Sequence, residues 1–257
     1  MPIRAIMKVF CKMAAAAVVG SSHIERGEPC QDYAASTRGK TVGAIALADG
    51  AGSARHSAEG ARLVVLGTLK LVRNEFRELV RMQPEDAAER IVDPLKRALA
   101  RHAERRSIDV VALASTLLFA ASDGVHFLCG QLGDGRVAMF DKTSWRAKAA
   151  FEPHKGEFFN ETVFVTSRNA SVDLRFSSGE IGDLGGFALL SDGAEESLYN
   201  RAAASFAPAL TSMMGWLAGH PERSVRSALG DNLSKTLRER TTDDLSVALL
   251  RLVPPPS

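Results

Sequence analysis

The most constraining feature of this sequence is an aspartate placed directly after a short apolar run. Ala44–Ala48 is typical of a buried strand, and Asp49-Gly50 ends that run before a series of small residues. Such a carboxylate is held by a rigid element while its oxygens face open space. Gly50 lets the backbone approach a ligand closely, and its carbonyl can itself be a ligand. Asp-Gly is also an ordinary turn sequence, so this stretch alone does not establish a site.

Four other aspartates also lie at the ends of predicted strands: Asp32, Asp134, Asp192 and Asp243. If these ends converge, carboxylates about 4 Å apart repel each other by roughly 4 kcal/mol per pair at an effective dielectric constant of 20. Mg²⁺ and Mn²⁺ favour carboxylate, carbonyl and water ligands, so two such cations would relieve the repulsion. A water that bridges two metal ions loses a proton readily and becomes a nucleophile. The pattern therefore predicts a hydrolytic site with two metal ions.

The apolar spacing predicts a mixed protein of the α+β class. Strands are expected at residues 14–19, 44–48, 110–121, 125–129, 136–140, 187–190 and 245–250. Helices are expected over 58–80, after Pro84, over 194–217 and over 222–240, with Ser57 as the N-cap of the first. The turn at 122–124 predicts a hairpin, and the strands around it and at 136–140 are expected to form an antiparallel meander. We find no repeat or linker and expect a single domain over residues 1–257, with its core at about 14–252.

Six short motifs follow one another along the chain: Gln31-Asp32, Asp49-Gly50-Ala51-Gly52, Ser115-Thr116, Gly133-Asp134-Gly135-Arg136, Ser191-Asp192-Gly193 and Asp243-Asp244-Leu245-Ser246. Their order and spacing resemble the metal-dependent serine/threonine protein phosphatases of type 2C. Gly20-Ser21-Ser22-His23 with Pro29-Cys30, and Gly156-Glu157 with Asn160-Glu161-Thr162, resemble the bacterial branch of that family. The resemblance extends from about residue 18 to about residue 252 and implies a four-layer α-β-β-α sandwich. In such a sandwich two stacked, mainly antiparallel sheets are flanked by helices.

The resemblance also implies a role for each acidic residue. Asp49 would bridge both metal ions, and the Gly50 carbonyl would complete the ligands of one. Asp192 and Asp243 would hold the second ion, and these three aspartates would form the catalytic set. A water bridging the two ions would attack phosphoserine or phosphothreonine directly, without a phosphoenzyme.

Two further aspartates would have weaker roles. Asp134, with help from Asp192, would hold a third Mg²⁺ or Mn²⁺ ion, and Asp32 would act partly through bound waters. The acidic residue that usually precedes Asp32 is Gln31 here, and the asparagine that usually follows the last aspartate is Asp244. Ser246 and Thr116 are expected to support packing and hydrogen bonding.

The phosphate-binding residues of the family are not all present. The arginine that usually contacts the substrate phosphate falls on Gly27, which leaves His23 and Arg26 as candidates for that contact. Eukaryotic members have a histidine directly after Asp-Gly that serves as a general acid. The corresponding position here is Ala51, so this general acid is missing. His56 is treated as ordinary unless it faces the site. The resemblance implies that residues 141–186 contain a flap near the site. Within this interval the pattern at 162–166 is typical of a strand.

Composition excludes several other classes of function. A net charge of +2 provides no electrostatic case for nucleic-acid binding, and the basic run 96–106 is interpreted as a solvated helix face. Cys11, Cys30 and Cys129 show no zinc or disulfide spacing, which suits a reducing cytoplasm. Residues 13–20 could be mistaken for a signal peptide, but Lys12 interrupts the run and a strand is preferred. No stretch is long enough to span a bilayer, so no membrane association is expected.

We therefore expect a cytoplasmic, monomeric phosphatase whose partner is a phosphoprotein, opposing a serine/threonine kinase. Two alternatives stay open. One is a regulatory or binding module that keeps the fold but turns over weakly, and the other is a small-molecule phosphohydrolase that uses the same metals.

Overall fold

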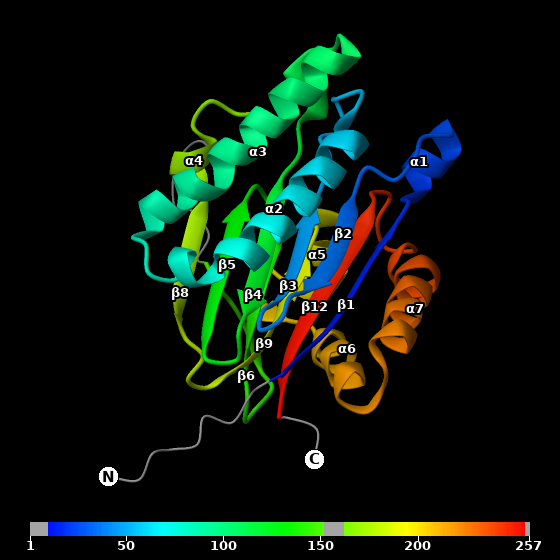
Figure 1. Ribbon diagram of the computed structural model, residues 1–257. Coiled ribbons are helices and arrows are strands. Elements are labelled where there is room, and N and C mark those ends of the chain that lie inside the picture. Colours follow the sequence, from blue (N-terminus) through cyan, green and yellow to red (C-terminus); the bar gives the residue numbers. More distant parts are fainter. Residues whose placement is uncertain (1–9, 152–161, 255–257) are drawn as a thin grey trace.

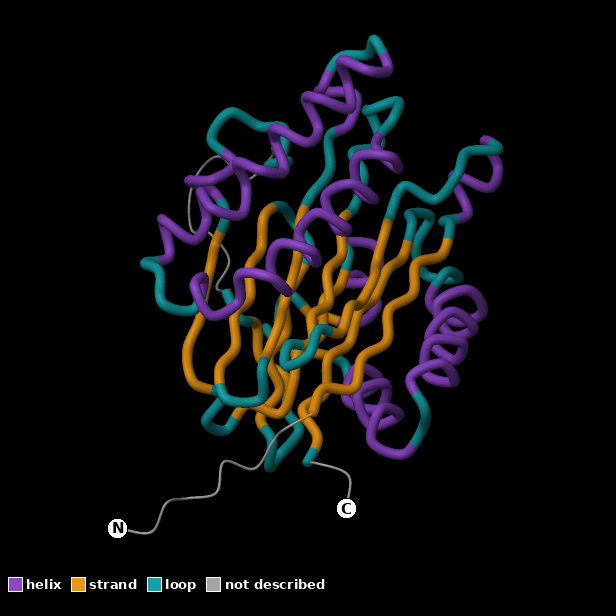
Figure 2. The backbone as a smooth tube through the Cα atoms, viewed as in Figure 1, coloured by secondary structure: helices purple, strands orange, loops and turns teal. Residues whose placement is uncertain are grey.

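The computed structural model describes residues 10–151 and 162–254. Its centre is a pair of five-stranded sheets in which all neighbouring strands are antiparallel (Figures 1 and 2). The first sheet has the order β1 (Phe10–Val18), β12 (Leu245–Val253), β9 (Leu184–Leu190), β6 (Arg136–Asp141), β7 (Ala147–Ala149). The second has the order β2 (Tyr33–Arg38), β3 (Gly43–Ala48), β4 (Leu117–Ser122), β5 (His126–Leu132), β8 (Arg175–Glu180).

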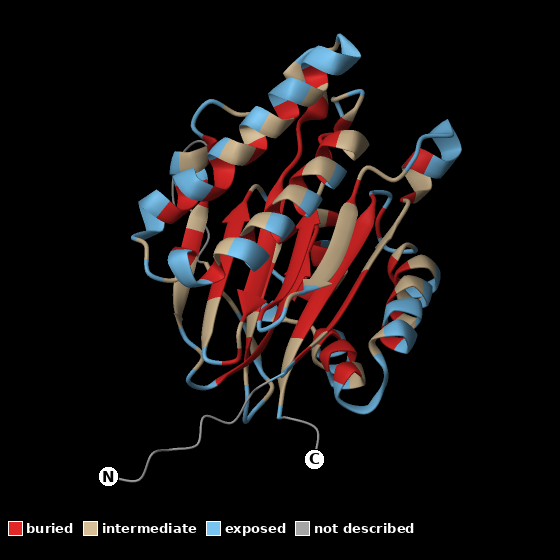
Figure 3. Cartoon of the chain, viewed as in Figure 1, coloured by how far each residue is buried: buried red, intermediate tan, exposed pale blue. Residues whose placement is uncertain are grey.

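Helices cover the outer face of each sheet. The long helices α2 (Ser57–Leu79) and α3 (Pro84–Arg106) pack on the second sheet, and α6 (Pro208–Gly219) and α7 (Glu222–Asn232) pack on the first (Figure 1). The buried residues form two helix-facing clusters and a third cluster between the sheets, and most of the central strands are buried (Figure 3). This confirms the expected four-layer sandwich. Among the helices that the structure describes, none combines the length and apolar character needed to cross a membrane.

Alternating side chains of β3 contact two different layers of the sandwich. Ala44, Ala46 and Ala48 belong to the helix-facing cluster, while Ile45 and Leu47 belong to the cluster between the sheets. Successive side chains of a strand point to opposite faces, so the small residues face α2 and the large ones face the other sheet. A strand buried on both faces reads as one continuous apolar run, which is why 44–48 was recognisable in the sequence.

The predicted meander is wrong in two respects. Residues 110–113 form a 3₁₀ helix (Val110–Leu113) instead of strand, and β4 begins only at Leu117. The side chain of Asp109 accepts a hydrogen bond from the Val111 amide at 2.9 Å, and this local contact favours the turn. The hairpin between β4 and β5 is confirmed, but β6 pairs with β9 in the other sheet. The loop at Gly133, whose φ is 103°, carries the chain from one sheet to the other.

Other predicted elements are divided or missing. The expected helix over 194–217 is split into α5 (Asp192–Leu198) and α6, with a small hairpin, β10 (Tyr199–Asn200) and β11 (Ser205–Phe206), between them. Pro208 opens α6, because a helix accommodates proline in its first turn. The helix expected over 222–240 ends as α7 at Asn232 and continues as one π-helical turn, Leu233–Leu237.

The structure also corrects smaller details near these elements. Residues 162–166 do not form a strand, whereas α4 (Ala170–Asp173) follows shortly after them. Ser57 is the first residue of α2 and His56 is its N-cap, so the predicted cap is shifted by one residue. The elements α1 (Ser21–Arg26) and β2 were not predicted, because both are short and largely polar or small in composition. The motif residues 156–161 lie outside the described residues.

All five aspartates lie at the same end of the two sheets, and strand pairing groups them within each sheet. Tyr33 at the start of β2 pairs with Ala48 at the end of β3, so Asp32 and Asp49 are neighbours across the sheet edge. In the other sheet, Leu190 at the end of β9 pairs with Val247 near the start of β12 and with Arg136 at the start of β6. The aspartates flanking these positions, Asp134, Asp192 and Asp243, therefore meet at the corresponding edge.

Candidate metal centre

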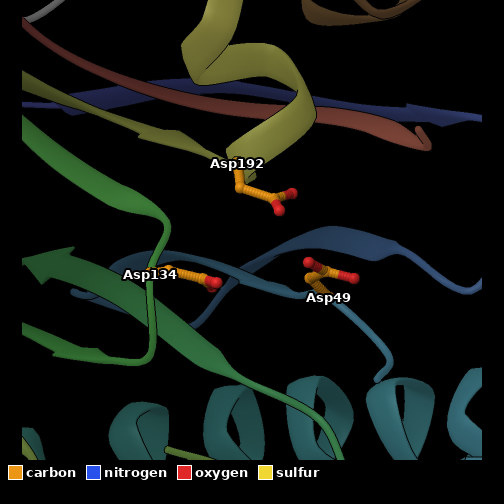
Figure 4. Close-up of side chains that lie close together, drawn as sticks. All are labelled: Asp49, Asp134 and Asp192. Atoms are coloured by element: carbon orange, nitrogen blue, oxygen red, sulfur yellow. The ribbon is translucent and has the colours of Figure 1, made fainter. Parts of the chain in front are cut away.

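A compact group of carboxylates lies where the two sheet edges meet. Asp49, Asp134 and Asp192 each offer an oxygen atom, and these three atoms lie within 4.8 Å of one another. Asp49 follows β3 of one sheet and Asp192 follows β9 of the other, and the three side chains point into a common space (Figure 4). That space is a cavity of about 170 Å³, lined by His23, Gln31, Asp49, Gly50, Ala51, Gly52, Asp134, Thr162, Phe164, Asp192 and Asp243.

Asp49 is held in place through its backbone. Its amide donates a hydrogen bond to Thr116 Oγ at 2.9 Å, and the Thr116 amide donates to the Asp49 carbonyl at 2.8 Å. Gly50 forms a bridge with Ser115 just beyond the sheet. A Cβ at position 50 would lie 2.8 Å from Ser57 Cβ and 2.9 Å from the Gln31 carbonyl oxygen, so only glycine fits. These contacts fix the backbone at Asp49 and leave its carboxylate available for a ligand.

The opposite side of the cavity is built from the ends of β9 and β12. The Ser246 amide donates to Ser191 Oγ at 2.9 Å, and the Ser191 amide donates to the Ser246 carbonyl at 3.1 Å, which joins the two strands beside Asp192. Asp192 begins α5, and its Oδ1 accepts a hydrogen bond from the Gly193 amide at 2.6 Å. Asp243 Oδ1 similarly accepts from the following amide at 2.8 Å. Each carboxylate thus keeps a second oxygen for the cavity.

Asp32 lies behind the cavity. It is buried, and its Oδ2 accepts a hydrogen bond from Ser246 Oγ at 2.7 Å. Its Oδ1 is also buried but has no hydrogen-bond partner. A buried carboxylate oxygen without a partner is costly unless a cation or water satisfies it. This orphan atom fits a site that takes up a cation with its bound waters.

Three of the carboxylates, those of Asp49, Asp192 and Asp32, have raised pKa values. Burial, with repulsion from Asp32 and Asp192, raises the pKa of Asp49 well above its usual range. Burial, with repulsion from Asp134 and Asp243, raises the pKa of Asp192 to about 6. Burial also raises the pKa of Asp32 to about 7. No lysine or arginine is among the described residues that line the cavity, so the negative charge has no cation supplied by those residues. A set of oxygen ligands with this excess of charge fits Mg²⁺ or Mn²⁺.

Comparison with known proteins identifies the family. Residues 19–238 match the family described as Protein phosphatase 2C. The chain belongs to the protein phosphatase 2C family. It is 28% identical over 250 residues to serine/threonine-protein phosphatase 3 of Escherichia coli (strain K12). This alignment covers 93% of this chain and 97% of that protein.

Solved structures of the type 2C fold agree with this assignment. The S. agalactiae serine/threonine phosphatase has a TM-score of 0.64 and 16% identity, covering 95% of this chain and all of that one. RsbX has a TM-score of 0.55 and 16% identity, covering 96% of this chain and 99% of that one. At these identities the structural matches show a common fold. The predicted family and fold are therefore confirmed.

The predicted ligands of this type 2C phosphatase-family chain fall into two groups. Five line the cavity: Asp49, Gly50, Asp134, Asp192 and Asp243. The sixth, Asp32, lies in the layer behind them. Asp134 is exposed, and its Oδ2 accepts a hydrogen bond from Thr162 Oγ at 2.6 Å. The sequence does not predict this hydrogen bond from Thr162, because residues around Thr162 show no clear pattern.

The two predicted phosphate ligands of the type 2C site are separated. His23 is buried and lines the cavity, whereas Arg26 is exposed and its Nε contacts Glu28 Oε2 at 2.8 Å. Gly27 ends α1 with φ of 67°, a conformation that disfavours arginine at the position where the family usually has one. Sequence reasoning gave Asp244 no role, although Asp244 Oδ1 lies 2.9 Å from His23 Nδ1. The sequence feature that could have indicated this contact is the aspartate at position 244, where the family usually has asparagine.

Proposed function

We propose that this protein is a metal-dependent phosphoprotein phosphatase that hydrolyses phosphoserine and phosphothreonine with two Mg²⁺ or Mn²⁺ ions. The observation that carries the proposal is the convergence of Asp49, Asp192 and Asp243 from two sheets on one cavity without a lysine or arginine among the described lining residues. Members of this family act on phosphoproteins, which agrees with a serine/threonine kinase as the opposing enzyme.

Two ions can be assigned ligands from the residues present. Asp49 would contact both ions, the Gly50 carbonyl would contact one, and Asp192 and Asp243 would hold the other. Asp134 with Asp192 would hold a third, weaker ion. When bound, the ions would polarise the phosphate oxygens and make a water acidic enough to attack at neutral pH. RsbX, which shares the fold, was solved in complex with magnesium and supports this choice of metal.

The protein's own residues would define the reacting geometry. The backbone contacts of Asp49 and the joined ends of β9 and β12 hold the carboxylates in a fixed array, so little reorganisation is needed as charge develops on the phosphoryl group. His23 stands at the wall of the cavity, where it would contact the substrate. Arg26, paired with Glu28 at the surface, is the less favourable of the two predicted phosphate ligands.

The proposal is tested by hydrolysis assays on phosphoserine and phosphothreonine peptides, nucleotides and sugar phosphates, each with Mn²⁺ and with EDTA. We expect hydrolysis of the phosphopeptides that depends on Mn²⁺. The matched variants are Asp49→Asn, which removes a central ligand, and Asp231→Asn, an exposed aspartate that contacts Lys235 at 2.8 Å. Calorimetric titration with Mn²⁺ should show loss of binding in the first variant only. Hydrolysis by Asp49→Asn at the wild-type rate would contradict the proposal.

A weakly active regulatory module is the second candidate. It is favoured by Gly27 and by Gln31, whose side-chain oxygen accepts a hydrogen bond from Ser57 at 3.1 Å in place of an acidic residue. Metal binding without hydrolysis of any phosphopeptide would support this candidate. Faster hydrolysis of nucleotides or sugar phosphates than of peptides would instead indicate a small-molecule phosphohydrolase. The single domain, the monomeric state and the cytoplasmic location stay predictions.

A further inference from the structure

We propose that His23, oriented by Asp244, is the proton donor for the departing serine or threonine oxygen. This inference rests on the proposed phosphatase function. It assigns a catalytic residue to the cavity wall and a positioning residue behind it. Cleaving an alkyl phosphate releases a strongly basic alkoxide, and a positioned acid typically contributes about 10²–10⁴-fold to such a step.

His23 has the location that this role requires. It belongs to α1, and its side chain is only 6% exposed, yet it lines the same cavity as Asp49 and Asp243. Position 51, where the eukaryotic members have a histidine, holds Ala51 at that cavity. His56 is not among the described lining residues, and its Nδ1 lies 3.5 Å from Glu59 Oε1. Among the described residues, His23 is therefore the histidine that reaches the carboxylate cluster.

Asp244 is built to hold one edge of the His23 ring. Its side chain is 2% exposed, and its two oxygens accept hydrogen bonds from the Gly20 amide at 2.7 Å and the Gln31 amide at 2.6 Å. With its carboxylate fixed in this way, Oδ1 lies 2.9 Å from His23 Nδ1. Nδ1 is buried and makes no aligned hydrogen bond, and the Asp244 carboxylate is the polar group beside it.

The pairing determines which ring nitrogen can transfer a proton. Because Nδ1 lies beside the fixed Asp244 carboxylate, Nε2 is the ring nitrogen left to transfer a proton to the substrate. His23 Nε2 lies 3.7 Å from Glu28 Oε2, beyond hydrogen-bond distance, and Glu28 is already in contact with Arg26. The Cys30 thiol near Asp244 has its pKa raised by burial, so it adds no charge beside the pair.

The step balances in atoms and electrons. The oxygen of the attacking water forms a bond to phosphorus, and the bond between phosphorus and the alcohol oxygen breaks. The electron pair of that bond moves to the alcohol oxygen, which takes the proton from His23 Nε2 and leaves as serine or threonine. The proton lost by the attacking water returns to the imidazole through solvent. The net products are an alcohol and inorganic phosphate.

The test compares two esters that differ in their need for a proton. A phosphothreonine peptide releases an alkoxide, whereas p-nitrophenyl phosphate releases a stabilised phenolate. With Mn²⁺, we expect His23→Ala to lower kcat for the peptide by about 10²–10³-fold and kcat for the aryl ester by less than about tenfold. His23→Gln preserves much of the side-chain volume and should show the same selectivity. His56→Ala is the matched control and should leave the ratio of the two rates unchanged.

Asp244→Asn tests the positioning role separately. It should lower kcat for the peptide by about tenfold with little change for the aryl ester. In the metal-free protein, ¹⁵N NMR should show a proton on His23 Nδ1 in the wild type and a redistribution between the two nitrogens in Asp244→Asn. This readout does not depend on turnover.

Three results would overturn the inference. Equal losses on both esters in His23→Ala, especially through KM, would make His23 a phosphate ligand instead. Unchanged kcat on the peptide would remove His23 from the reaction. A wild-type protein that binds Mn²⁺ but hydrolyses neither ester would overturn the proposed function and this inference together. The first two results leave the proposed function intact.

Discussion

Acidic residues on neighbouring elements of this molecule are balanced in opposite ways. Glu195 on α5 has a side chain that is only 1% exposed, and its Oε1 lies 2.8 Å from Arg136 Nη2 and 3.0 Å from Arg201 Nε. The Arg136 guanidinium also stacks 4.0 Å from the centre of the Tyr199 ring. The charge of buried Glu195 is therefore balanced by two arginines.

The aspartates of the candidate metal centre have no lysine or arginine partner among the described residues that line the cavity. Asp192 begins the same helix that carries Glu195, and Asp134 immediately precedes the turn into Arg136, so the two groups share their supporting elements. Burial of a charge is tolerated when a counter-charge is at hand, and it perturbs the pKa when none is present. The comparison indicates that the paired acid serves the structure, while the unpaired acids form a cluster that could bind a cation.

The largest expected effect comes from removing a central unpaired charge. Asp49→Asn should lower Mn²⁺-dependent hydrolysis of a phosphopeptide by at least about 10³-fold, since metal ions supply several kcal/mol of transition-state stabilisation. Without metal, the variant should melt at the same temperature as the wild type or higher, because one repulsive carboxylate is gone. The measurements are steady-state kinetics and thermal unfolding in EDTA. A variant that melts well below the wild type in EDTA would show that Asp49 supports the fold as Glu195 does.

The reverse result is expected for the paired acid. Glu195→Ala leaves the Arg136 charge buried without its partner and should lower the free energy of unfolding by about 3–5 kcal/mol. Urea denaturation measures this loss. Asp231→Ala removes one partner of an exposed ion pair and should cost no more than about 1 kcal/mol. If both variants cost the same, Glu195 is not a structural counter-charge and the contrast between the two groups fails.

The unpaired group should also make the metal-free protein sensitive to pH. Burial raises the pKa of Asp192 from 3.8 to about 6 and that of Asp32 to about 7. A carboxyl with a raised folded-state pKa holds its proton longer in the folded state, so stability falls as pH rises through this window. The Tm in EDTA should drop by roughly 5 °C between about pH 5 and about pH 8, since 1 kcal/mol shifts a domain of this size by about 2–4 °C.

Saturating Mn²⁺ should remove most of this slope, because the bound ions then balance the charges. Asp192→Asn should flatten it in EDTA, whereas Asp231→Asn should not. A Tm in EDTA that is constant or rises over the same interval would contradict the assignment of these carboxylates as an unbalanced group.

The sequence predicted the unpaired group better than the paired one. Each aspartate ends or begins a strand, and antiparallel pairing brings such positions to one sheet edge, so Asp49, Asp192 and Asp243 were recognisable from local patterns. Arg136 and Glu195 carry no comparable signal, because their contact depends on how β6 and α5 pack. The placement of β6 itself was mispredicted, since a glycine-rich loop can either turn a hairpin or pass the chain to another sheet.

The same limit applies to the cavity wall. His23 was a candidate from its motif, but its pairing with Asp244 joins α1 to the start of β12 and is visible only in three dimensions. Arg26 was an equal candidate in the sequence, and one turn of helix places it at the surface. Short-range spacing therefore identified the carboxylates that converge on the cavity, while the contacts of the cavity wall required the fold.

The smallest effect is expected from bringing a cationic side chain into the unpaired group. Ala51 is 8% exposed, lines the cavity, and its amide donates to the Ala114 carbonyl at 3.0 Å, so Ala51→His would place an imidazole near the carboxylates. In the wild-type background we expect a gain of at most about threefold on a phosphothreonine peptide, because His23 already supplies the proton. In the His23→Ala background the gain should reach about tenfold on the peptide and be smaller on p-nitrophenyl phosphate.

Equal gains on the two esters, or a selective gain on the aryl ester, would show that position 51 does not deliver the leaving-group proton. The added cation would then act on the carboxylates alone, and a higher Tm in EDTA near pH 6 without a selective rate gain would demonstrate it.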